Sequence, residues 1–69
     1  MNTIKVISNE PNAKALLSGM MTAIEHFCDS DDTDVVDKGD NWIVVRCKDL
    51  DTSVYLWELD SHGCLNPIQ

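Results

Sequence analysis

The sequence predicts a small α+β fold in which one helix packs on a small antiparallel sheet, in the order β-α-β-β(-β). Three observations lead to this fold class. The stretch 9–28 carries apolar side chains at three- and four-residue spacing, which is typical of an amphipathic helix. The stretches 42–48 and 53–59 are rich in β-branched and aromatic residues, which favours strands. A shorter alternating run precedes the helix.

The strands are expected in chain order as follows. "TIKVIS" at 3–8 predicts a short first strand, because apolar and polar residues alternate in it. "TDVV" at 33–36 is a weaker candidate, followed by a turn in "DKGDN". "WIVVRCK" and "SVYLWEL" are the clearest strands, and "CLNPIQ" is expected to be a tail.

The helix is expected in "NEPNAKALLSGMMTAIEHFC", with Asn9 or Asn12 as its N-cap and Pro11 in its first turn. We expect Gly19, which costs up to ~1 kcal/mol relative to alanine, to let the helix backbone approach the sheet closely. One apolar stripe is expected to cover the sheet, made of Leu16, Leu17, Met20, Met21, Ile24, Phe27 and Cys28.

The two clearest strands are separated by "DLDT", which predicts an antiparallel hairpin with Lys48 opposite Ser53 and Val45 opposite Leu56. Side chains alternate between the two faces of a strand. One face of the hairpin is then mostly aliphatic and suits burial under the helix: Ile43, Val45, Cys47, Val54 and Leu56. The opposite face carries Trp42, Val44, Arg46, Tyr55, Trp57 and Leu59.

This second face is expected to be an interaction surface, because a single helix cannot cover both sides of a sheet. Uncovered apolar patches commonly mark interfaces, and Trp, Tyr and Arg are enriched among binding hot spots. The predicted partner-binding residues on it are Trp42, Arg46, Tyr55 and Trp57. The alternative is that the strands curl enough to bury the aromatic side chains inside the protein.

The charge is strongly acidic, with 12 acidic against 5 basic residues and a formal net charge of −7. Such a chain repels nucleic acid and anionic membranes, because phosphate affinity depends on Lys and Arg. A basic protein partner is favoured instead. No stretch approaches the ~20 apolar residues of a membrane span. Three cysteines without a signal peptide predict free thiols and a cytoplasmic location.

The stretch "DSDDTDVVDKGD" at 29–40 concentrates the acidic residues. A calcium loop starting at Asp29 fails, because its sixth place needs Gly and holds Asp34, and its twelfth needs Glu and holds Asp40. Phosphate mimicry is a sharper hypothesis, in which aligned carboxylates occupy the nucleic-acid site of a DNA-binding protein. The alternative is a solvated loop. The carboxylates expected to meet a basic partner are Asp29, Asp31, Asp32, Asp34, Asp37 and Asp40.

Two His-x-Cys repeats suggest a zinc-binding alternative that uses His26, Cys28, His62 and Cys64. The spacing argues against it, because residues two apart on a helix point ~200° around its axis from each other. We therefore expect neither metal nor cofactor. Catalysis is not expected either. Asp60-Ser61-His62 are adjacent in sequence, whereas a triad converges from separate parts of a fold, and no phosphate-binding glycine loop is present.

The sequence thus predicts a single domain, 1–69, that serves as a small acidic protein-binding module. Its partner is expected to be basic or nucleic-acid-binding. An inhibitory or accessory role fits this class, as in many short acidic proteins of mobile elements, although no particular residue supports that association. The alternative from another class is a homodimer in which the aromatic sheet face is the seam.

Overall fold

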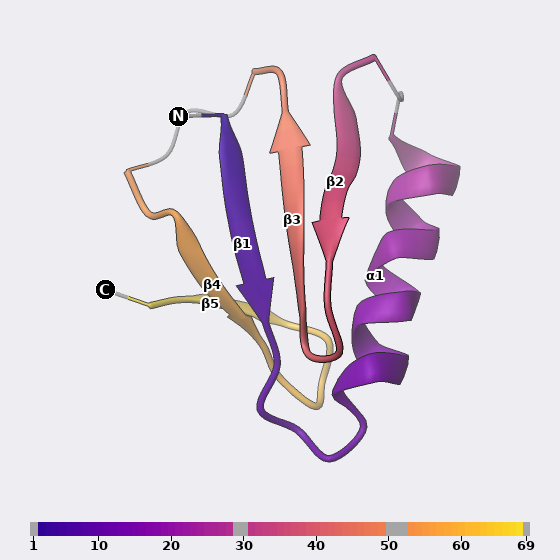
Figure 1. Cartoon of the computed structure of the whole chain (residues 1–69), viewed down its shortest axis with the longest axis vertical. Coiled ribbons are helices and arrows are strands. Elements are labelled where there is room, and N and C mark those ends of the chain that lie inside the picture. Colours follow the sequence, from indigo (N-terminus) through magenta and orange to yellow (C-terminus); the bar gives the residue numbers. More distant parts are fainter. Residues whose placement is uncertain (1, 29–30, 50–52, 69) are drawn as a thin grey trace.

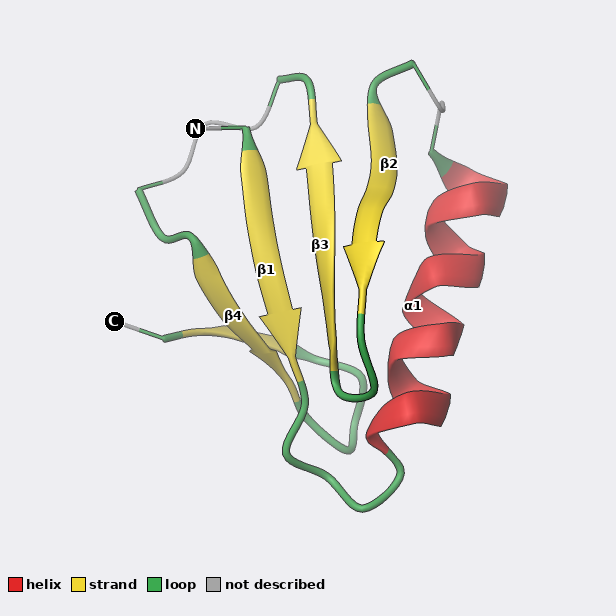
Figure 2. Ribbon diagram, viewed as in Figure 1, coloured by secondary structure: helices red, strands yellow, loops and turns green. Residues whose placement is uncertain are grey.

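The computed structural model describes residues 2–28, 31–49 and 53–68. These residues form one helix and a five-stranded sheet, shown in Figures 1 and 2. The predicted α+β class and its element order are confirmed, and the tail adds a fifth strand. The elements are β1 (Thr3–Ile7), α1 (Ala13–Phe27), β2 (Thr33–Lys38), β3 (Trp42–Cys47), β4 (Leu56–Leu59) and β5 (Leu65–Pro67).

The sheet is mixed rather than wholly antiparallel, with the strand order β2-β3-β1-β4-β5. β1 lies between β3 and β4, antiparallel to the first and parallel to the second. The predicted hairpin between the two clearest strands is therefore wrong. With β1 between them, Val6 pairs with Ile43 on one side and Trp57 on the other, and Val6 is fully buried. A central position thus removes the apolar residues of β1 from water.

The core lies between α1 and one face of the sheet. Its buried members come from four elements: Val6, Leu17, Ile43, Val45 and Leu59. The predicted helix stripe packs against them through Leu16, Met20, Met21 and Ile24. Phe27 and Cys28 were expected in this stripe, but both are exposed, Phe27 by 87%. They lie at the end of α1, beyond Ile24, which is the last helix residue of the cluster.

Two local expectations for the helix differ from the structure. Asn12 occupies the N-cap position of α1 but makes no capping hydrogen bond with its side chain, and Asn9 instead donates to Glu58 Oε2 at 2.7 Å. A Cβ atom at Gly19 would meet nothing within 4 Å, so this glycine does not bring the helix backbone close to the sheet. No helix among the described residues is long and apolar enough to cross a membrane.

The turn between β4 and β5 is organised by the Asp60 carboxylate. Its Oδ1 atom accepts the backbone N–H groups of His62 and Cys64, each at 2.9 Å, and its Oδ2 atom accepts from the Asn66 side chain at 3.2 Å. Gly63 has φ 79°, a left-handed conformation that favours glycine. The Cys64 N–H, followed by the Asn66 amide and the His62 N–H, holds the pKa of Asp60 below its ordinary value.

Candidate functional site

Within residues 2–28, 31–49 and 53–68, one face of the sheet has no helix packed on it, and we call it the open face. Because paired residues of neighbouring strands share a face, the register places six side chains at its centre: Lys5, Ile7, Trp42, Val44, Arg46 and Leu56. All six are partly or well exposed. The tail does not fold across them, because it pairs edge-on with β4 as β5. The open face therefore combines apolar area with the cationic side chains of Lys5 and Arg46, and Glu58, which pairs with Ile7, adds a carboxylate at its β4 end. Trp and Arg are among the residues enriched in protein interfaces.

Of the predicted aromatic group, only Trp42 lies on the open face. Trp57 pairs with buried Val6 and packs against the core on the helix side, and its Nε1 donates to the Val54 carbonyl at 2.9 Å. Leu59 shares that side and is only 4% exposed. The predicted aromatic face is thus wrong, because it depended on a hairpin that β1 prevents. Leu56, predicted for burial under the helix, lies on the open face instead.

Tyr55 lies just before β4 and is 52% exposed. Its carbonyl accepts the Lys5 N–H at 2.8 Å, which continues the parallel pairing of β1 with β4 beyond the strand. Tyr55 is two positions from Trp57, so the alternation of the strand directs it away from the Leu56 side. The structure therefore does not bring Tyr55 together with Trp42.

Trp42 is held against the sheet by two contacts. The Lys5 ammonium lies 4.9 Å from the centroid of the indole ring, within cation–π range. On another side the indole lies against Gly39, where an added Cβ would overlap its Nε1 and Cε2 atoms. Gly39 belongs to the β2–β3 turn, and its N–H donates to the Trp42 carbonyl at 2.9 Å. The turn and β1 together give the indole a defined position, which is what a binding anchor requires.

Arg46 also lies on the open face, but it already has a partner. Its Nη2 atom lies 2.8 Å from Asp34 Oδ2, across the β2–β3 ladder. The Arg46 side chain is 55% exposed and that of Asp34 is 36% exposed. The other carboxylate oxygen, Asp34 Oδ1, is shielded from solvent and has no hydrogen-bond partner among the described residues. The pair thus offsets part of the local negative charge.

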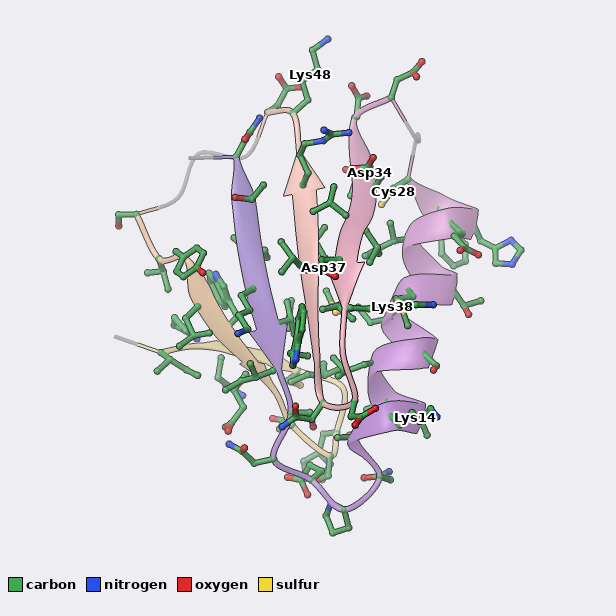
Figure 3. The ribbon with its side chains drawn as sticks, in the orientation of Figure 1. Lys14, Cys28, Asp34, Asp37, Lys38 and Lys48 are labelled. Carbon is green, nitrogen blue, oxygen red and sulfur yellow. The ribbon has the colours of Figure 1, made fainter. Side chains whose placement is uncertain are left out.

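Most of the predicted acidic residues lie on β2 or directly beside its two ends. Asp31 and Asp32 are exposed just before the strand, Asp40 is exposed in the turn after it, and Asp29 lies outside the described residues. Asp34 and Asp37 are on β2, and Figure 3 labels both. A regular strand would direct residues three apart to opposite faces, but the register shifts at Val36.

The shift at Val36 brings Asp34 and Asp37 onto the same face. Asp34 pairs with Arg46 and Asp37 pairs with Val44, two residues that are themselves on the open face. Because these β3 partners are two positions apart, the two aspartates are spaced by about 6.6–6.8 Å along the strand. The open face is therefore bordered by two carboxylates from the edge strand of the sheet.

The zinc alternative is not supported by an assembled set of ligands. His26 and Cys28 lie at the end of α1, and His62 and Cys64 lie in the β4–β5 turn. Within the described ranges, no three or more His, Cys, Asp or Glu side chains come together in a way that could hold a metal ion. All three cysteines are free thiols, and Cys28 and Cys64 are exposed.

Three residues of the open face were missed by sequence reasoning: Lys5, Ile7 and Leu56. The alternation in "TIKVIS" already places Lys5 and Ile7 on the opposite face of the strand from Ile4 and Val6. Because Val6 is buried, Lys5 and Ile7 must lie on the open face. Leu56 could be placed only by knowing which strand pairs with β4.

Comparison of the chain with protein-family models, with curated proteins and with solved structures finds no match, so the geometry alone supports a function.

Proposed function

We propose that the protein is a small acidic protein-binding module whose open face docks on a basic surface of a partner protein. The observation that carries this proposal is the position of Trp42, which lies on the helix-free face of a sheet that is bordered by Asp34 and Asp37. A tryptophan held in place supplies apolar anchoring. The carboxylates of β2 and its flanking turns steer a basic partner, in keeping with the net charge of −7.

Charge complementarity favours a basic partner over an acidic or neutral one. Exposed carboxylates surround the open face on the β2 side, from Asp31 and Asp32 through Asp37 to Asp40. Arg46 neutralises Asp34, so the other aspartates carry the electrostatic attraction. A nucleic-acid-binding protein is one partner of this kind, and the module would then act as an inhibitor. The spacing of Asp34 and Asp37 is about twice the ~3.4 Å advance per phosphate of a DNA strand.

The test compares two pairs of variants in quantitative capture from host lysate, followed by affinity measurement with the purified captured protein. Trp42→Ala is paired with Trp42→Phe, which keeps an aromatic anchor. Asp37→Lys is paired with Glu10→Lys, which makes the same change in net charge away from β2. Circular dichroism establishes that each variant is folded. We expect Trp42→Ala and Asp37→Lys each to weaken binding at least tenfold, with smaller losses for their paired controls.

The salt dependence gives a second readout. Binding of the unsubstituted protein should weaken as ionic strength rises, and Asp37→Lys should reduce this dependence. Equal affinity of all four variants for the captured protein would overturn the proposal. If duplex DNA competes with the module for the captured protein, the narrower hypothesis of inhibition by phosphate mimicry is supported, and simultaneous binding of DNA and module would exclude it.

A homodimer formed through the same face is the second candidate. The open face carries both signs of charge, with Lys5 and Arg46 beside Asp34 and Asp37, so two copies have complementary groups to offer each other. The net charge of −7 on each copy opposes this association. Sedimentation at micromolar concentration separates the two candidates. A dimer that Trp42→Ala dissociates supports the second, and a monomer over this range excludes it.

A further inference from the structure

The open edge of β2 lies beside a groove. Among the residues that the structure describes, β2 ends the sheet and has β3 as its one strand neighbour. Three hollows follow one another between α1 and this strand, and successive hollows share lining residues. The first hollow lies near Cys28 and shares Glu25 and Val35 with the middle hollow. The middle hollow shares Met21 and Lys38 with the third hollow, which lies near Lys14. Figure 3 shows Cys28, Lys38 and Lys14 in this order along the helix.

The backbone of β2 presents hydrogen-bonding groups to this groove. In an antiparallel ladder, hydrogen-bonded and non-hydrogen-bonded pairs alternate. The Lys48 N–H donates to the Asp32 carbonyl at 2.6 Å, so the 32–48 pair is hydrogen-bonded. Thr33 pairs with Cys47 and Val35 with Val45, one and three steps further along the ladder. The N–H and C=O groups of Thr33 and Val35 therefore point away from β3, toward the open edge.

We propose that this edge accepts an extended basic segment of the partner protein as an additional strand, seated in the groove between β2 and α1. The inference rests on the proposed function and names the form in which the basic partner binds. Strand addition supplies affinity through main-chain hydrogen bonds and specificity through alternate side chains. Residues 33–35 offer one short stretch of regular ladder for it, and the register shift at Val36 ends this stretch.

Charge selects a basic segment as the occupant. The acidic residues that line the groove are Glu25, Asp34, Asp37 and Asp40, against Lys14 and Lys38. Asp34 is paired with Arg46, so Glu25, Asp37 and Asp40 supply the negative charge. Glu25 belongs to the helix, whereas Asp34 and Asp37 face the other side of the sheet. Alternate side chains of an added strand therefore find carboxylates on both faces. Lys14 lines the far hollow, and Lys38 lines the far and middle ones. The hollow beside Thr33 is therefore lined by Glu25 and Asp34 and by neither lysine.

The same charges disfavour pairing between two copies of this chain. Joining two β2 edges would bring the aspartates of one copy beside those of the other, and like charges on neighbouring strands are destabilising. Natural proteins place charged side chains and bulges on edge strands to prevent such self-association. The β2 edge is thus closed to a second copy while it stays complementary to a strand of opposite charge.

The test uses a hexapeptide of alternating lysine and valine with blocked termini. Its control has the same sequence with every backbone amide N-methylated, which keeps every charge but removes the N–H groups from both edges of the peptide. We expect the unmethylated peptide to bind at least tenfold more tightly. Amide hydrogen exchange measured by NMR on the unsubstituted protein should slow at least tenfold at Thr33 and Val35 when the peptide binds. Equal affinity of the two peptides, or no added protection at these amides, would overturn the inference.

A variant pair tests the edge from the protein side. Thr33→Pro removes an outward N–H that makes no ladder bond to β3, and Thr33→Ala keeps this N–H while losing the same hydroxyl. We expect the first to weaken peptide binding at least tenfold and the second less than twofold. If Thr33→Pro does not fold, the exchange measurement decides alone. If both peptides bind the unsubstituted protein equally well and Asp37→Lys abolishes this binding, strand addition is overturned. The same result supports the proposed acidic docking surface.

Discussion

Arg46 and Asp34 lie opposite each other on β3 and β2, with Arg46 Nη2 at 2.8 Å from Asp34 Oδ2. Both were predicted to meet a partner, and in the structure they meet each other. Because the two side chains are 55% and 36% exposed, water screens their attraction. The pair is therefore better suited to orienting charge on the open face than to stabilising the fold.

A double-mutant cycle of Arg46→Ala and Asp34→Ala tests this interpretation. We expect a coupling free energy of about 0.2–1 kcal/mol from urea unfolding at low salt, decreasing as salt is added. Each measurement uses the same buffer, and m-values common to all four proteins establish that the unfolded state is unchanged. A coupling above about 2 kcal/mol would show that the pair stabilises the fold as a buried pair does.

Gly39→Ala is expected to displace the Trp42 indole, because the added Cβ would overlap Nε1 and Cε2 of the ring. If the ring does not move freely, the crowding costs about 1–3 kcal/mol in the free energy of unfolding. A displaced indole loses its place against Lys5. A changed NMR shift for the Trp42 indole N–H, with the Trp57 indole N–H unchanged, is the result that supports this geometry. Unchanged shifts for both would contradict it.

Gly19→Ala is expected to stabilise the protein by about 0.5–1 kcal/mol, because alanine has the higher helix propensity and its Cβ would meet nothing within 4 Å. Gly63→Ala is the matched control. It also has free space around it, but its φ of 79° is left-handed, so alanine there should cost about 1–2 kcal/mol. Urea unfolding of the two variants measures both signs, and a destabilised Gly19→Ala variant would show that this glycine has a close neighbour after all.

The β4–β5 turn is expected to loosen in acid. Hydrogen bonds from the Cys64 N–H, the Asn66 amide and the His62 N–H lower the pKa of Asp60 in the folded protein. A carboxyl whose pKa is lower in the folded than in the unfolded state contributes its full stabilisation above the unfolded value of about 3.8, and this is lost as pH falls through the lowered folded pKa.

The measurement is an NMR titration of the Cys64 amide between neutral pH and strong acid. Its shift and exchange rate should change together, with a midpoint below the ordinary value for aspartate. Asp60→Asn should remove this titration while Asp40→Asn, in the other turn, leaves it in place. A Cys64 amide that titrates with the same midpoint in Asp60→Asn would assign the effect to another group.

The sequence by itself determined the α+β class, the helix and the two faces of β3. Ile43 and Val45 alternate with Trp42, Val44 and Arg46, and the first pair is buried as the pattern predicts. The helix stripe was also correct from Leu16 to Ile24. These properties follow from the local geometry of the backbone, which repeats every 3.6 residues in a helix and every two in a strand.

Tertiary structure alone decided which side Trp57 faces and how the carboxylates of β2 align. Alternation within β4 already places Trp57 and Leu59 on the opposite face of the strand from Leu56 and Glu58. Only the register of β4 against β1 shows which of these two faces lies toward the core. The bulge at Val36 likewise turns Asp34 and Asp37 to the same face, against the period of a regular strand. Strand pairing depends on the total burial reached by residues far apart in the chain. A pattern read over a few residues therefore cannot determine it.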